Sequence, residues 1–237
     1  MPRTKMTRHE LKEQDEITTS LQKISEFVVL RKKEVTTAVT VVAVLVIGIF
    51  GWNYYRSSRN ANAQTQLSQA INTFNDTVNI KSEKERYEKA IVEAQKTYDQ
   101  YRSLPIGNIA LYYVGLSQEG LGDTAKATQS LQEVSQRGDA SIKAVAQFAL
   151  GAIYKKHGQT QKAIDAYKQL YDSGGYSKAA VAYELGSLYE ANKQPDQAKD
   201  FYQKLVSEFP DSPFRQNADE ALKRLGGTTP APAQKPS

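Results

Sequence analysis

The apolar residues of this chain form one long uninterrupted run near its start and recur at helical spacing farther along. The run covers residues 35–55 and contains no charged side chain. A helix rises about 1.5 Å per residue, so this run is roughly 30 Å long, the thickness of the hydrocarbon core of a bilayer. The pattern therefore predicts a single N-terminal transmembrane helix over residues 35–55.

The residues on either side of this run are typical of a membrane-water interface. Basic residues 31–33 precede the run, and Tyr54 and Tyr55 end it just ahead of Arg56. Counted over about twenty residues on each side, more Lys and Arg residues precede the run than follow it, which predicts a cytoplasmic N-terminus. A buried core helix and a cleaved signal peptide, with an Ala-x-Ala site at 61–63, are the alternative interpretations.

The segment ahead of the run, residues 1–34, is polar and predicted to be cytoplasmic. It holds eight basic and six acidic side chains. Its apolar residues recur at spacings of four, three and four: Ile17, Leu21, Ile24 and Val28. This spacing indicates an amphipathic helix over residues 10–30, and a solvated tail with a charged face is the alternative.

Downstream of the run, the sequence repeats itself about every 35 residues. The segments 111–134, 147–170 and 182–205 superpose without a gap. Each contains a glycine, an alanine twelve residues later and a large side chain four residues after that. These three sets are Gly115, Ala127 and Leu131; Gly151, Ala163 and Tyr167; and Gly186, Ala198 and Tyr202. Small residues allow two helix axes to approach closely, so the pattern predicts an all-α solenoid with two antiparallel helices in each unit.

The repeat pattern also predicts how the rest of the chain is organised. A degenerate first helical unit is expected over residues 63–105, ahead of three repeats over 106–213. A polar capping helix over 214–226 should close the array, because a terminal repeat must expose a soluble face. The tail at 227–237 is rich in proline and is expected to be disordered.

The small and aromatic positions of the three repeats resemble those of the tetratricopeptide repeat (TPR). The resemblance implies a concave groove lined by the first helix of each pair. The groove positions it implies are Tyr112, Leu116, Glu119, Phe148, Ala152, Lys155, Tyr183, Ser187 and Glu190. The rings of Tyr112, Phe148 and Tyr183 would form an aromatic ladder suited to an extended peptide or a partner helix. The alternative is that these rings fill gaps between helices.

Charge and composition exclude several classes of function. The net charge is +5, but residues 60–237 hold 21 basic and 20 acidic side chains and form no basic stripe, so we expect no nucleic-acid partner. The chain has no cysteine and only two histidines, His9 and His157. No motif for a nucleophile, a metal site or a phosphate cradle is present. We therefore expect no catalytic residue, metal, cofactor or small-molecule substrate, and no enzymatic activity.

The order of segments, with Gly51-Trp52-Asn53-Tyr54-Tyr55 ending the apolar run, resembles the bacterial ancillary subunit family of the SecYEG translocon. The resemblance implies a single-pass protein of the bacterial inner membrane with a periplasmic C-terminal domain. That domain would bind the translocon, a periplasmic chaperone or a nascent secreted chain. Residues 209–213 also resemble repeats of envelope-assembly proteins, so an adaptor binding Tol-Pal or outer-membrane assembly components is one alternative. A purely structural subunit of a membrane complex is another.

Overall fold

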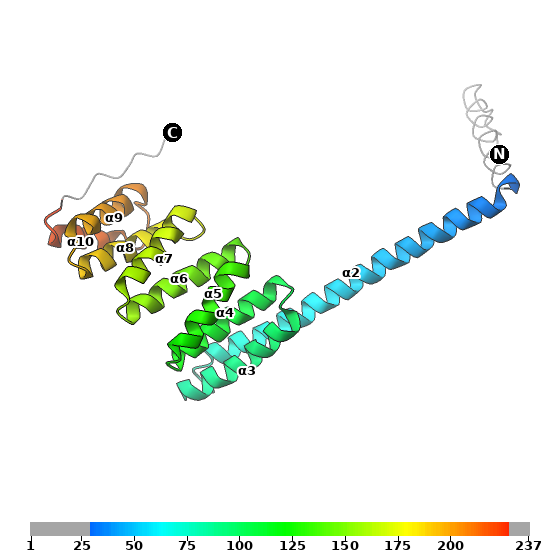
Figure 1. Ribbon diagram of the computed structural model, residues 1–237, viewed down its shortest axis with the longest axis horizontal. Coiled ribbons are helices and arrows are strands. Elements are labelled where there is room, and N and C mark those ends of the chain that lie inside the picture. Colours follow the sequence, from blue (N-terminus) through cyan, green and yellow to red (C-terminus); the bar gives the residue numbers. More distant parts are fainter. Residues whose placement is uncertain (1–28, 228–237) are drawn as a thin grey trace, which may run out of the picture. The chain divides into compact units, whose positions relative to one another are not determined.

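The computed structural model describes residues 29–227, and all regular structure within that range is helical (Figure 1). The all-α prediction is therefore confirmed for these residues. The chain divides into two compact units, residues 1–59 and 60–237. Most of the predicted cytoplasmic segment, and all of the predicted tail except Gly227, lie outside the described residues.

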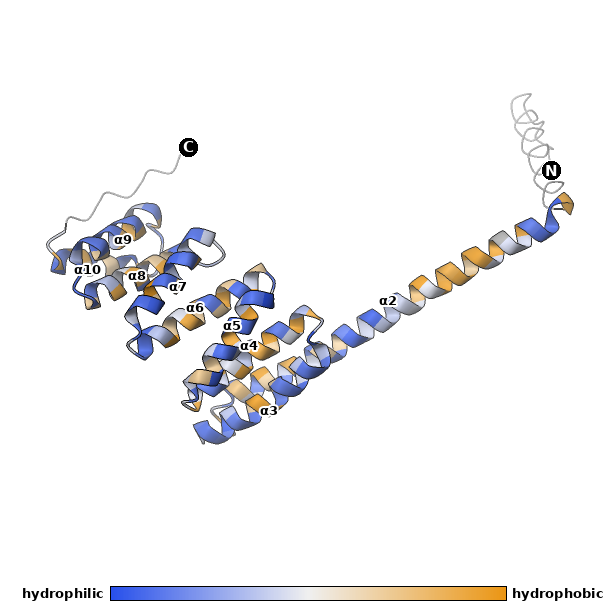
Figure 2. Cartoon of the chain, in the orientation of Figure 1, coloured by the Kyte–Doolittle hydropathy of each residue, from blue (hydrophilic) through white to orange (hydrophobic). Residues whose placement is uncertain are grey.

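The predicted transmembrane run lies within helix α2 (Lys32–Asn75). Figure 2 shows an apolar stretch along this helix. By length and composition the helix could cross a membrane, and none of its most apolar window is buried. Threonine hydroxyls at the start of the run bond to the backbone of the same helix: Thr36 donates to the carbonyl of Lys32, and Thr40 donates to the carbonyl of Thr36. The crossing itself stays a prediction.

The second unit is a stack of helix pairs that begins with the last turns of α2 (Figure 1). The helices that follow are α3 (Glu83–Tyr101), α4 (Pro105–Gly120), α5 (Thr124–Arg137), α6 (Ala140–Lys156), α7 (Thr160–Ser173), α8 (Lys178–Ala191), α9 (Pro195–Glu208) and α10 (Arg215–Arg224). Side chains cap several of their N-termini: Ser82 caps α3, Asp139 caps α6 and Ser177 caps α8 by accepting backbone N–H bonds. Helices α4 and α9 instead begin with proline, which needs no N–H partner there.

Each predicted repeat is a pair of helices, and the repeat glycine marks the point of closest approach between them. In the third repeat, a Cβ atom on Gly186 would lie 2.6 Å from the ring of Tyr202. In the second, a Cβ atom on Gly151 would lie 2.7 Å from the ring of Tyr167. Both tyrosines are buried. The large residue of the second helix therefore fills the space that the glycine leaves, as the spacing predicts.

The last turns of α2 pair with α3, in the region predicted as a degenerate first unit. Ala63 and Ala70 of α2 and Ala90 and Ala94 of α3 are fully buried. Phe74, near the end of α2, contacts the rings of Tyr87 and Tyr113 at centroid distances of 5.6 and 5.4 Å. This contact joins the end of α2 to α3 and α4.

The core of the second unit consists of two hydrophobic clusters that follow one another along the stack. The first extends from Ala70 to Ile153, and the second from Ala144 to Leu222. Helix α6 contributes to both clusters. Helix α10 ends the second cluster by burying Ala218, Ala221 and Leu222, and its other residues are exposed or half-buried. This is the arrangement expected of a capping helix.

Candidate functional site

The nine predicted groove residues lie on the first helices of the three repeats, three on each helix. Tyr112, Leu116 and Glu119 lie on α4; Phe148, Ala152 and Lys155 on α6; and Tyr183, Ser187 and Glu190 on α8. Their spacing of four and three residues places each set on one side of its helix. We call this surface the first-helix face. Ala152 is exposed and the other eight residues are half-buried.

The charged residues of this face pair with the first helix of a neighbouring repeat. Between α4 and α6, Glu119 accepts bonds from Lys156 Nζ at 2.7 Å and lies 2.9 Å from His157 Nε2. Between α6 and α8, Lys155 Nζ donates to Glu184 at 2.7 Å and to Ser187 at 3.2 Å. The predicted groove charges therefore connect successive repeats.

The same pattern continues at the C-terminal end of the stack. The guanidinium of Arg224 on α10 donates to Glu190 on α8 at 2.9 Å, and the hydroxyl of Tyr202 donates to the same carboxylate at 3.1 Å. Glu190 is half-buried, while Arg224 is exposed. Partly exposed pairs of this kind contribute about 1 kcal/mol or less each to the free energy of unfolding.

The environment of Glu119 favours its ionised form. Burial disfavours the charge and would raise the pKa, but the hydrogen bonds from Lys156, His157 and Thr124 together outweigh it. The pKa of the Glu119 carboxyl is therefore lowered. His157, which the sequence places in a turn between helices, is thus a partner of this carboxylate.

Two of the three predicted ladder rings are covered by other rings of the same chain. Phe148 stacks on Tyr176, with centroids 4.5 Å apart and ring planes 22° apart. Tyr183 stacks on Phe214, with centroids 5.4 Å apart and planes 21° apart. For these two rings the alternative, that they fill gaps between helices, fits the geometry.

Tyr112, the third ring of the predicted ladder, has a different environment. Its ring meets the edge of Tyr113 at a centroid distance of 5.6 Å. Burial raises the pKa of Tyr112 to about 12, and the neighbouring hydroxyls of Tyr113 and Tyr176 contribute in the same direction. The rings therefore do not form a uniform exposed ladder, and a binding role for the nine residues stays a prediction.

Tyr176 and Phe214 contribute to this face, and sequence reasoning assigned neither of them to it. Tyr176 follows the glycine pair 174–175, in the loop between α7 and α8. Gly174 adopts a left-handed φ of 68°, and a Cβ atom on Gly175 would lie 3.1 Å from Ala144. The glycine pair signals a turn in the sequence, but it does not indicate that the turn packs against α6 and directs a ring toward Phe148.

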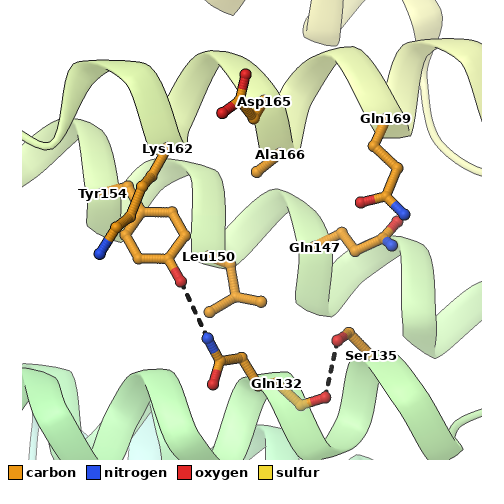
Figure 3. A pocket seen from close by; sticks show the side chains of 9 residues that line it. All are labelled: Gln132, Ser135, Gln147, Leu150, Tyr154, Lys162, Asp165, Ala166 and Gln169. Atoms are coloured by element: carbon orange, nitrogen blue, oxygen red, sulfur yellow. Dashed lines mark hydrogen bonds between the residues drawn. The ribbon is translucent and has the colours of Figure 1, made fainter.

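A polar cleft lies between α5, α6 and α7 (Figure 3). It has a volume of about 300 Å³, and its lining includes three glutamines. The side chain of Gln132 donates to the hydroxyl of Tyr154 at 3.2 Å, and Ser135 donates to the backbone carbonyl of Gln132 at 2.8 Å. Within residues 29–227, no group of three His, Asp or Glu side chains is arranged to hold a metal ion.

Solved structures with a similar fold are helical-repeat proteins. A putative kinesin light chain of Podosopora anserina, with nearly identical TPR-like repeats, matches 69% of this chain and 85% of its own length. Its sequence identity is 17% and its TM-score is 0.55. A tetratricopeptide repeat protein from Parabacteroides merdae matches 68% of this chain and 60% of its own length, with 17% identity and a TM-score of 0.54. At these identities the likeness shows the fold alone.

No curated protein matches the chain. The family model of the tetratricopeptide repeat-like domain matches residues 32–218, which is more than three quarters of the chain. Together with the helix pairs and the close approach at Gly151 and Gly186, this match shows that the chain belongs to the tetratricopeptide repeat-like domain family.

Proposed function

We propose that this protein is a membrane-anchored, non-enzymatic scaffold whose TPR-like domain binds other proteins. Two features of the chain together carry the proposal. The first is the stack of helix pairs, whose first-helix face is only partly buried. The second is an uncharged helical run with no buried residues in its most apolar window. The repeat fold is consistent with protein binding. An exposed apolar run long enough to span a bilayer is stabilised by lipid rather than by water.

The proposed partners are the Sec translocon and either a periplasmic chaperone or a nascent secreted chain. The support is the order of segments and the aromatic end of the apolar run at residues 51–55, which resemble the ancillary subunit of the translocon. A tether keeps the domain at a high effective concentration near its partner, so a weak contact with the first-helix face suffices for binding.

The contacts described above leave only some residues of the first-helix face available to a partner. Glu119, Lys155 and Glu190 are held in pairs between repeats. Phe148 is covered by Tyr176. The exposed Ala152 and the half-buried Leu116 on the neighbouring helix are therefore the best positions at which to detect a partner.

Photo-crosslinking in intact cells tests the proposed partners. A photoreactive amino acid is placed at Leu116 or Ala152, with Gln129 on the exposed side of α5 as the control position. We expect adducts with translocon subunits, a periplasmic chaperone or a secreted chain from the two face positions, and far fewer from the control. Adducts with Tol-Pal or outer-membrane assembly components, or no adduct at either face position, would contradict the proposed partners.

Protease accessibility tests the proposed topology. In cells whose outer membrane has been opened, added protease should digest the repeat domain while the inner membrane is still intact. Protection of the domain until the inner membrane is disrupted would place it in the cytoplasm. Release of the protein by alkaline washing would exclude the membrane anchor.

A further inference from the structure

A cleft between α7, α8 and α9 contains three aromatic rings in one group. Its volume is about 590 Å³, and its lining includes Tyr171, Tyr189 and Phe201. The rings of Tyr189 and Phe201 are nearly parallel, with planes 10° apart and centroids 5.6 Å apart. Tyr171 meets Phe201 edge to face at 90° and 5.8 Å. We call this site the aromatic cleft.

The polar cleft of Figure 3 is the equivalent site one repeat earlier, and it lacks two of these rings. Counted along the repeat, Ser135 stands where Tyr171 lies, and Ala166 stands where Phe201 lies. Only Tyr154, the equivalent of Tyr189, is aromatic in both sites. The smaller side chains give the polar cleft no set of facing rings, so a ligand that needs several rings would distinguish the two sites.

Three aspartates and two lysines, Lys168 and Lys204, line the aromatic cleft, and two of the aspartates have no ion-pair partner among the described residues. A further lysine, Lys178, lies over the ring of Tyr171 at 5.4 Å. Asp200 pairs with Lys204 at 2.7 Å, and Lys204 also lies over the ring of Phe201 at 5.1 Å. Asp172 and Asp196 line the cleft without such a pair. The cleft therefore combines aromatic surface with two carboxylates that can accept a cation.

The chain itself carries a segment with the matching chemistry. Residues 228–237 contain three prolines and one lysine, Lys235, and no acidic side chain. Proline-rich segments favour the extended polyproline II helix, which aromatic grooves bind with little loss of conformational entropy. This segment thus offers prolines for the rings and a cation for the free carboxylates.

The segment also begins at the same end of the stack as the cleft. The N–H of Gly227 donates to the carbonyl of Leu222 at 2.8 Å, which fixes the start of the segment at the end of α10. Arg224, three residues before Gly227, donates a hydrogen bond to Glu190. Glu190 directly follows Tyr189 of the aromatic cleft. Ten residues of polyproline II helix extend roughly 30 Å. We propose that the proline-rich segment 228–237 docks in the aromatic cleft of its own chain.

Cross-linking within the full chain tests this proposal, because the protein contains no cysteine of its own. One cysteine replaces Ala233 in the segment, and a second replaces Gln197, which is exposed in the lining of the aromatic cleft. The control pair uses Lys162→Cys, at the equivalent position of the polar cleft. A short bis-maleimide is added to the detergent-solubilised protein at low concentration. We expect about tenfold more intramolecular product from the Gln197 pair.

Because Lys162 is also farther along the chain from the segment, a second comparison separates docking from simple proximity. Pro230, Pro232 and Pro236 are replaced together by serine in the Gln197 pair, which leaves the described fold untouched. If the rings bind the prolines, the product should fall several-fold, to near the level of the control pair. Equal product with and without the prolines, or equal product from the two cysteine pairs, would overturn the proposal. Product formed only between two chains would instead identify a second copy as the occupant and would also overturn it.

Discussion

At the scale of single residues, the repeat glycines are positions where one methyl group decides how two helices pack. Gly186 lies on α8 against Tyr202 of α9, a side chain with only 2% of its surface exposed. A ring enclosed to this degree cannot move aside without opening the cluster around it. The same reasoning applies to Gly151 and Tyr167.

We predict that Gly186→Ala destabilises the repeat domain although alanine favours a helix. The better helix propensity contributes about 1 kcal/mol, but the overpacked contact costs typically 1–3 kcal/mol or more, because the added Cβ would lie 2.6 Å from a ring carbon. Urea unfolding followed by circular dichroism measures the difference. Gln129→Ala is the control within the same domain, since this residue is exposed on α5 and the change adds no atom to a helix contact. Equal stability of the two variants would show that the contact can relax.

Glu119 is a second residue whose contribution can be isolated, and here pH provides the test. Its pKa is lowered in the folded protein, so its stabilising effect is present above the unfolded-state value of about 4.3 and is lost as the pH falls through the folded value. We predict that Glu119→Gln costs about 1–2 kcal/mol at pH 7, because three hydrogen bonds to a charged acceptor are lost or weakened.

Thermal unfolding of the wild type and of Glu119→Gln between pH 7 and pH 3 measures this effect. The difference between the two proteins should shrink toward the acidic end of the series. The control is Glu88→Gln, an exposed residue with one loose pair to Lys84 at 3.8 Å, which should change stability by less than about 0.5 kcal/mol. A difference for Glu119→Gln that stays constant over the whole range would contradict the assigned pKa direction.

At the scale of helices and turns, the repeat period predicts each helix pair because the pattern of small and large residues sets which faces meet. Gly115, Ala127 and Leu131 suffice to place α4 against α5.

The environment of the predicted groove is harder to predict from the sequence than the helix pairs are. The position of Phe148 can be inferred from the repeat, but the ring that covers it comes from the loop between α7 and α8, at Tyr176, whose path depends on tertiary packing. Pairs such as Lys155 with Glu184 likewise join residues of different repeats, and no periodicity encodes their choice of partner.

The turns between the two helices of each repeat have one residue in the left-handed conformation, and in the third repeat this residue is not glycine. Gly122 and Gly158 adopt left-handed φ angles of 81° and 68° in the first two repeats. In the third repeat this position is Lys193, with φ of 57°. A left-handed conformation costs a residue with a Cβ atom about 1–2 kcal/mol, whereas glycine adopts it freely.

We predict that Lys193→Gly stabilises the protein by about 0.5–1 kcal/mol. Relief of the left-handed strain exceeds the entropy that glycine adds to the unfolded chain. The reciprocal change, Gly158→Ala, should destabilise by about 1 kcal/mol, because a Cβ there meets no neighbour and only the backbone conformation is affected. Chemical unfolding of both variants checks the opposite signs. A loss of stability in Lys193→Gly would show that the lysine side chain contributes more than its backbone strain costs.

At the scale of the whole repeat domain, the two hydrophobic clusters make its stability local. Contacts run mainly between neighbouring helices, and the clusters meet at α6. In such a stack, stability is approximately a sum of the units and of the interfaces between neighbours. Damage at one end should therefore open the helices near it before it reaches the other end.

Leu222→Ala provides a test of this locality. Leu222 is fully buried on α10, at the C-terminal edge of the second cluster, and truncation of a buried leucine costs typically 2–5 kcal/mol. We predict that hydrogen exchange measured by mass spectrometry becomes faster in α8, α9 and α10, while peptides from α4 and α5 keep the wild-type rate. Leu131→Ala, in the first cluster, should reverse this pattern, with faster exchange in α4 and α5 and near wild-type rates in α9 and α10. Equal acceleration of exchange in all helices by both variants would contradict local stability. The domain would then unfold as a single cooperative unit, and α10 would stabilise all of its helices.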